Sequence, residues 1–363
     1  MKNYFNKLHY ETDLSIENKI ILIFLLIFSL FYTLVVKIRK ILYSIGILKQ
    51  NKLNAFVISV GNLTTGGTGK TPITVEIANY ISDKLRQNTA ILSRGYGGKL
   101  SASDINIISD GKNIFYSAHL SGDEPYWMAS NSENTPILTC KDRYESGIKA
   151  INEFGSRVII LDDGFQHLKL KRDLNILVVD CHLRFGNGYL LPAGPLREPI
   201  DQIKRADKII LVNKKSLDAS SGQLCKNFAE ELASTYKKPV FSCNFINKGV
   251  FCLKTSQKLP ITSNVLAFAG IARPEYFFEY LSKEGVQLLK TRVFSDHHLY
   301  TSDDIRNIIK EAKMIGADAI ITTEKDAVKL KALLGEKSVD IDFYALKLGI
   351  DLDVAKLLEN IEL

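Results

Sequence analysis

The feature that most constrains this fold is a glycine-rich segment, GNLTTGGTGKTP at residues 61–72. A short apolar run, residues 56–60, precedes it. Apolar residues at helical spacing follow it between residues 71 and 85. A phosphate-binding loop needs this order of strand, loop and helix, because backbone N–H groups and a helix N-terminus together surround the phosphate. The segment therefore predicts an α/β fold with a parallel sheet and a site for nucleotide phosphates.

Within this loop, Lys70 is expected to reach the β- and γ-phosphates, and the Thr71 hydroxyl is expected to bind Mg²⁺. Thr64 stands where the usual spacing G-x-x-x-x-G-K-[ST] has glycine. A simple glycine-rich turn at a helix start is the alternative interpretation. The expected nucleotide-binding residues are Thr64, Thr65, Gly66, Gly67, Thr68, Gly69, Lys70 and Thr71.

Two observations bear on the class of nucleotide-binding protein. Partition-type ATPases carry a lysine at the position of Thr65, which argues against that class here. The candidate for a guanine-binding N-K-x-D motif is NKKS at residues 213–216, which lacks the aspartate. ATP is therefore favoured over GTP.

A pair of carboxylates follows a second apolar run. Residues 158–161 read VIIL, and Asp162 and Asp163 come directly after them. Carboxylates at the carboxyl end of a parallel strand face the site of an α/β sheet, and one of them can hold Mg²⁺. A solvated Asp-Asp turn is the alternative. The position beside a phosphate loop favours a metal site formed by Thr71, Asp162 and Asp163.

Further apolar runs at residues 176–179, 208–212, 265–269 and 319–322 indicate more buried strands. Residues 301–315 have helical spacing, and residues 237–262 are irregular. We therefore expect two α/β units. The expected division is an N-terminal membrane segment at 1–50, a phosphate-loop domain at 51–240, a linker at 241–262 and a smaller α/β domain at 263–363.

Residues 20–36, IILIFLLIFSLFYTLVV, carry no charge. As a helix they span about 26 Å, against a hydrocarbon core of about 30 Å, so they predict a membrane anchor that either spans or lies in one leaflet. The acidic residues before this run and the lack of a cleavage pattern argue against a signal peptide, and a buried core helix is the other alternative. The basic residues that follow it place the remaining chain on the cytoplasmic side.

Composition excludes several other classes. Hydrophobic residues make up 46% and charged residues 24% of the 363-residue chain, which excludes a disordered protein. The net charge of +7 suits an anionic membrane or a phosphorylated substrate and is weak evidence for nucleic acid. Five scattered cysteines without a C-x-x-C pair argue against a disulfide framework or a zinc site.

Six motifs in a fixed order identify a resemblance. They are GNLTTGGTGKTP, SRGYGG (93–98), GDEP (122–125), DDGFQH (162–167), LPAGPLREP (191–199) and FSDHH (294–298). With the apolar N-terminal helix, they closely resemble the tetraacyldisaccharide 4'-kinases from about residue 20 to at least residue 330. The resemblance implies two α/β/α sandwich domains joined by a short β linker, with the active site in the cleft between them.

The resemblance also implies an activity: phosphorylation by ATP of the 4'-hydroxyl of tetraacyldisaccharide 1-phosphate, a lipid A precursor, on the cytoplasmic face of the inner membrane. Asp123 and His297 match a catalytic pair that handles the hydroxyl proton, with His298 as the neighbouring alternative. Arg197 matches a residue that stabilises the transferred phosphoryl group. Expected roles in substrate binding or in supporting the site fall to Tyr96, Glu124, Gln166, His167 and Glu198.

Lys325 and Asp326 also match a family segment without an assigned role. Neither nucleic acid nor an obligate protein partner is expected. Three other functions stay open: a membrane-anchored ATPase switch, a nucleotide sensor without chemistry, and a kinase of another membrane glycolipid.

Overall fold

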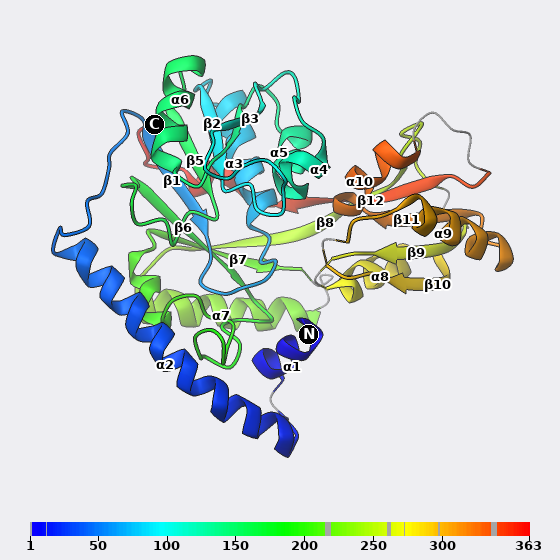
Figure 1. Cartoon of the computed structure of the whole chain (residues 1–363), viewed down its shortest axis with the longest axis horizontal. Coiled ribbons are helices and arrows are strands. Elements are labelled where there is room, and N and C mark those ends of the chain that lie inside the picture. Colours follow the sequence, from blue (N-terminus) through cyan, green and yellow to red (C-terminus); the bar gives the residue numbers. More distant parts are fainter. Residues whose placement is uncertain are drawn as a thin grey trace.

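The computed structural model describes residues 2–11, 13–214, 219–259, 263–271, 273–296, 298–334 and 340–363. In these ranges twelve strands form one sheet in the order β10-β9-β11-β12-β8-β7-β6-β1-β5-β2-β4-β3 (Figure 1). The strands are β1 Phe56–Gly61, β2 Thr89–Ser93, β3 Asn106–Ser109, β4 Ile137–Thr139, β5 Val158–Asp162, β6 Leu174–Asp180, β7 Lys208–Asn213, β8 Val240–Cys252, β9 Asn264–Ala269, β10 Gln287–Val293, β11 Ala319–Thr323 and β12 Phe343–Asp351.

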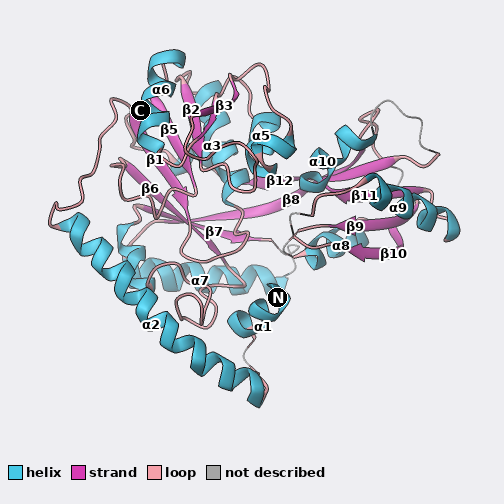
Figure 2. Cartoon of the chain, in the orientation of Figure 1, coloured by secondary structure: helices cyan, strands magenta, loops and turns pink. Residues whose placement is uncertain are grey.

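Helices cover both faces of this sheet (Figure 2). They are α1 Lys2–Tyr10, α2 Ile16–Ser44, α3 Lys70–Asp83, α4 Ala118–Ser121, α5 Asp123–Asn131, α6 Arg143–Phe154, α7 Ala219–Tyr236, α8 Pro274–Lys283, α9 Ser302–Met314, α10 Glu324–Leu334 and α11 Val354–Leu357, with a 3₁₀ helix at Ile200–Arg205. The expected α/β architecture with a parallel sheet around the glycine-rich loop is confirmed.

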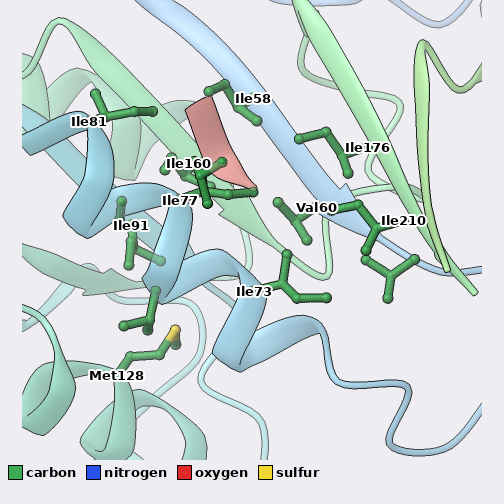
Figure 3. Packing of buried hydrophobic residues seen from close by; sticks show 14 of the residues in the cluster. Ile58, Val60, Ile73, Ile77, Ile81, Ile91, Met128, Ile160, Ile176 and Ile210 are labelled. Carbon is green, nitrogen blue, oxygen red and sulfur yellow. The ribbon is translucent and has the colours of Figure 1, made fainter. Parts of the chain in front are cut away.

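Apart from β3, which pairs antiparallel with β4 at the edge, the strands of the first half are parallel to one another. The central strands are apolar on both sides. Along β1, Ile58 and Val60 join a core with Ile73 and Ile77 of α3, as Figure 3 shows, whereas Val57 joins a core on the opposite face with α6. Such double-sided burial is typical of parallel strands between helix layers. β1 therefore ends at the centre of the sheet, and the glycine-rich loop begins there.

The two halves share the sheet through β8. This strand runs parallel to β7 at its start and antiparallel to β12 along most of its length. It covers much of the region that appeared irregular in the sequence. Buried, partly buried and exposed residues are mixed along the strand, so it lacks the continuous apolar run that marks the other strands.

The end of the chain returns to the first half. After β12, Val354 and Leu357 of α11 join the core that α3 forms with β1. The second half therefore packs against α3, the helix that follows the glycine-rich loop. No local sequence pattern predicts this long-range contact.

Among the described residues, one helix is long and apolar enough to cross a membrane, by length and composition alone. This helix is α2. One stripe of it packs against the protein. Ser29 donates a hydrogen bond to the Leu190 carbonyl (2.9 Å), and the Tyr32 hydroxyl donates to the Arg197 carbonyl (3.1 Å). The other faces expose large apolar side chains, including those of Ile23, Phe24, Leu30 and Phe31.

The cysteines require a correction. The scattered cysteines argued against a disulfide framework, whereas the structure joins Cys181, after β6, to Cys225 of α7. Their separation by 44 residues hid this proximity, because β6 and α7 meet only through the packing of α7 on the sheet.

Candidate active site

The glycine-rich loop is held open by its own backbone and by a neighbouring segment. Gly66 and Gly69 have φ angles of 103° and 93°, a region that favours glycine. The Thr65 N–H donates to the Pro195 carbonyl (2.7 Å), and the Arg197 N–H donates to the Leu63 carbonyl (2.7 Å). The LPAGPLREP segment thus runs beside the loop and fixes its path.

The predicted loop residues take the positions that a phosphate site needs. Lys70 is the first residue of α3, and Thr71 is buried directly after it. Thr64 forms a bridge to Leu196, and Thr68 accepts a hydrogen bond from the Asn62 side chain (2.9 Å). The helix N-terminus adds a partial positive charge at the position of Lys70.

Asp163 is the counterion of two cations at this loop. Both guanidinium nitrogens of Arg197 lie 2.8 Å from its carboxylate oxygens, and Lys70 Nζ lies 3.5 Å away. Although burial works in the other direction, Lys70 and Arg197 hold the pKa of Asp163 well below its usual range. The structure therefore brings Lys70, Arg197 and Asp163 together.

Asp162 lies in a different environment, although it is the adjacent residue. It is buried at the end of β5 and accepts a hydrogen bond from Thr74 (3.1 Å). Burial, with the nearby carboxylates of Glu124 and Asp163, raises the pKa of Asp162 to about 7. A divalent cation would stabilise the negative charge of a buried carboxylate that lies near two other carboxylates.

Asp123 and Glu124 begin α5, and α10 of the second half packs against them. Lys329 Nζ lies 2.8 Å from Asp123 Oδ2, with the two side chains only 8% and 12% exposed. One helical turn earlier, Lys325 Nζ lies 2.9 Å from Glu124 Oε1. We call these two contacts the lysine pair of α10.

Of these two lysines, Lys329 was not found from the sequence, and Lys325 was named there without a role. The contacts of a third lysine, Lys214, were also not predicted. Although burial works in the other direction, Glu124, Asp296 and Asp123 raise the pKa of Lys325. Lys214, at the end of β7, pairs with Asp180 (3.0 Å) and donates to the Gly67 carbonyl. The only local signals were lysines at i, i+4 in α10 and a lysine directly after a buried strand.

Glycines explain why two of the motifs occur together. A Cβ on Gly98 would lie 2.7 Å from the Leu120 carbonyl oxygen, and one on Gly122 would lie 2.8 Å from the Tyr96 carbonyl oxygen. SRGYGG and GDEP are therefore in backbone contact, and this contact positions Asp123. The Tyr96 side chain is itself 75% exposed.

The remaining predicted residues support the loop rather than meet one another. Gln166 donates to the Asn62 carbonyl (2.8 Å), and the buried Glu198 pairs with Arg205. Burial, reinforced by the nearby charge of Arg143, lowers the pKa of His167 to about 4. His167 is therefore neutral at physiological pH.

His297, the predicted partner of Asp123, lies outside the described residues. Its neighbour His298 is described: His298 Nε2 lies 3.2 Å from Asp304 Oδ2, and the His298 carbonyl accepts from Lys329 (3.2 Å). His298 is thus engaged at the start of α9. This contact leaves His297 as the candidate of the two for the catalytic pair.

The comparison with known proteins decides the family. The family model described as tetraacyldisaccharide-1-P 4'-kinase (LpxK) matches residues 21–362. The chain belongs to this family of kinases. It is 34% identical to the tetraacyldisaccharide 4'-kinase of Halothermothrix orenii over 351 residues, which covers 94% of this chain and 91% of the relative. It is 39% identical to the Geobacter metallireducens enzyme over 347 residues, with 94% and 98% covered.

A solved structure of the same family has a similar fold. The crystal structure of LpxK from Aquifex aeolicus in complex with ATP is 31% identical and superposes with a TM-score of 0.69. The match covers 92% of this chain and 95% of that one. The chain is therefore an enzyme of the kinase class with the fold of this family.

Proposed function

We propose that this protein transfers the γ-phosphoryl group of ATP to the 4'-hydroxyl of tetraacyldisaccharide 1-phosphate, giving lipid IVA in lipid A synthesis. The observation that carries the proposal is the contact between the first and second halves of the chain at Asp123. The glycine-rich loop, with Lys70, lies in the first half. Lys329 of the second half binds Asp123, a carboxylate suited to receive a hydroxyl proton.

The charge of each residue suggests its role in the reaction. Lys70 and the loop amides bind the β- and γ-phosphates, and Arg197 balances charge on the group in transfer. Asp123, with His297, takes the proton from the sugar hydroxyl as the new O–P bond forms. ADP leaves with the electrons of the broken bond. Lys329, 2.8 Å from Asp123 Oδ2, holds this carboxylate in place.

Mg²⁺ fits the carboxylate environment of this site. Thr71 and Asp162 are the residues that would hold it. Lys70 and Arg197 form ion pairs with Asp163, whereas the ion pairs of the described residues include none with the buried Asp162. Asp163 is engaged with Lys70 and Arg197, so we assign it a supporting role. When bound, the metal supplies charge neutralisation of the phosphates.

We also propose that the enzyme works at the cytoplasmic face of the inner membrane, with α2 lying along the lipid surface. The polar stripe of α2 contacts the Leu190 and Arg197 carbonyls, and Arg39 reaches the Gln166 carbonyl (3.2 Å). These contacts lie between Ser29 and Arg39, from the middle of the helix toward its C-terminus. They hold the segment that carries Arg197 next to the helix that would contact lipid, so an acylated substrate can remain in the bilayer during reaction.

The position of the new phosphate tests this proposal. The purified protein, ATP, Mg²⁺ and tetraacyldisaccharide 1-phosphate should give a product whose phosphorus NMR spectrum shows a second monoester, coupled to the 4' position. The Lys70→Ala variant should give less than about 1% of that product, since it loses charge balance in the transition state. Phosphate at another hydroxyl, or ADP release without a lipid product, would contradict the proposal.

A further inference from the structure

The carboxyl end of β6 leads to a cluster of donor groups apart from the residues assigned to phosphoryl transfer. Cys181, His182 and Cys225 offer two Sγ atoms and a ring nitrogen that all lie within 4.8 Å of one another. Cys181 is fully buried, and its Cα lies 5.4 Å from that of Cys225. We propose that these three side chains, with the cysteines reduced, bind a Zn²⁺ ion.

The histidine is held as metal-binding histidines usually are. His182 Nε2 lies 3.0 Å from the Asn213 side-chain oxygen. An amide oxygen only accepts hydrogen bonds, so we propose the tautomer in which Nε2 donates to this oxygen and Nδ1 carries the lone pair. A metal-binding histidine commonly donates its second N–H to an oxygen in this way, which fixes the tautomer and the ring orientation. Nδ1 is therefore the proposed ligand atom.

The backbone places the first two ligands without help from a metal. The Asp180 carboxylate accepts hydrogen bonds from the N–H groups of His182 (3.0 Å) and Leu183 (3.1 Å). The Cys181 N–H donates to the Val212 carbonyl (2.9 Å). The turn after β6 is thus fixed by buried hydrogen bonds, and it presents Cys181 and His182 toward Cys225 of α7.

The donor set suits zinc. Two thiolates and one imidazole are a common set for tetrahedral zinc, with water as a fourth ligand, and soft thiolates favour Zn²⁺ over Mg²⁺. The disulfide and the metal exclude each other, because both use the same two Sγ atoms. Reduction by a thiol or phosphine adds two electrons and two protons to the disulfide, and Zn²⁺ then displaces two thiol protons.

Two side chains connect the cluster to the glycine-rich loop. Asp180, which holds the turn, also pairs with Lys214, and Lys214 donates to the Gly67 carbonyl. A metal at this cluster would therefore fix a turn that supports the loop. The proposal itself concerns metal binding and does not depend on the proposed phosphoryl transfer, so its test uses no activity measurement.

Cobalt titration of the full-length protein in detergent tests the site. The protein, purified without a histidine tag, is reduced under nitrogen, stripped with a chelator and titrated with Co²⁺. We expect one equivalent to bind, with a thiolate-to-cobalt charge-transfer band and tetrahedral visible bands that one equivalent of Zn²⁺ removes. The oxidised protein should show none of these bands. Reduced protein with both thiols free and no charge-transfer band would overturn the proposal.

Variants separate the ligands. His182→Gln should weaken Co²⁺ binding by about 10-fold or more, since loss of even an outer-shell partner of a metal ligand costs about 10–100-fold. Cys225→Ser, which removes one of the two thiolates, should lower the intensity of the charge-transfer band by about half or more and weaken binding. Cys243→Ser, which changes a buried cysteine outside the cluster, should leave both unchanged. Equal binding by His182→Gln would overturn the three-ligand site. If Cys225→Ser does not fold, the comparison of oxidised and reduced wild-type protein decides.

Discussion

At the residue scale, the contact that matters most for the proposed activity is the ion pair of Asp123 with Lys329. Lys329 is buried and also lies 3.7 Å from Asp326 Oδ1 and 3.2 Å from the His298 carbonyl. Asp326 in turn accepts from the Gly270 N–H (2.9 Å) and the Thr323 hydroxyl (2.8 Å). A chain of buried polar contacts therefore connects the catalytic candidate to two turns of the second half.

Lys329→Met should lower kcat by about 100-fold while the KM for ATP changes little, because a misplaced catalytic group affects the transition state more than nucleotide binding. Steady-state kinetics with lipid acceptor measure this. Lys329→Arg should recover part of the activity, and Lys310→Met, on an exposed part of α9, is the matched control. An unchanged kcat in Lys329→Met would show that the pair is only structural.

His167 predicts a pH dependence of stability. Its folded pKa is about 4 because burial and Arg143 disfavour the charged ring, whereas an unfolded histidine has a pKa of 6.5. Between these values the unfolded chain binds more protons, so stability falls as the pH drops from 6.5 toward 4. The contribution lost at pH 4 is about 2–3 kcal/mol.

Thermal unfolding of wild type and His167→Gln across this pH range measures the effect. The difference between the two midpoints should change with pH between 6.5 and 4 and stay constant above pH 7. If the difference between the two midpoints did not change with pH, folding would not disfavour the protonated form of His167, and the prediction would be wrong.

Sequence reasoning found most residues of the loop but not their partners. Lys70, Thr71 and Asp162 follow from a local order of strand, loop and carboxylate, which the sheet then brings together. Lys329 could not be found in this way, because its contact with Asp123 depends on how α10 packs on α5 across the two halves. The sequence also predicted Asp163 as a metal ligand, because it could not show that Arg197 lies beside this carboxylate.

At the element scale, α2 divides its surface between protein and solvent-exposed apolar faces. The sequence predicted an apolar helix here, and the structure has a helix of 29 residues. Its contacts with the carbonyls of residues 190 and 197 were not predictable, because a polar residue in an apolar run does not show which distant carbonyl it will contact. The exposed faces indicate where lipid would contact the protein.

Replacing Phe24 and Phe31 together by serine should lower partitioning onto phospholipid vesicles by about 100-fold. Each exposed phenylalanine contributes roughly 1.5 kcal/mol or more when lipid covers it, and 1.4 kcal/mol corresponds to a factor of 10. Vesicle flotation measures the bound fraction. Ser29→Ala, on the stripe that contacts the protein, should leave flotation unchanged; a loss equal to that of the double variant would contradict this orientation of the helix.

At the scale of the whole molecule, one sheet carries both halves, and β8 and β12 connect them. The two α/β units were predictable from buried strands and helical spacing. Their union into one sheet was not, because β8 has no continuous apolar run and β12 pairs with a strand about a hundred residues earlier in the chain. The division into domains at residues 51–240 and 263–363 stays a prediction.

Transfer of label from γ-labelled ATP to tetraacyldisaccharide 1-phosphate tests the central claim most directly. With Mg²⁺ and detergent micelles, the wild-type protein should form a labelled lipid, and Asp123→Ala should form it at least about 100-fold more slowly with unchanged ATP binding. Equal rates in the two proteins, or ATP hydrolysis without any labelled lipid, would contradict the account of an ATP-dependent lipid kinase built across the two halves.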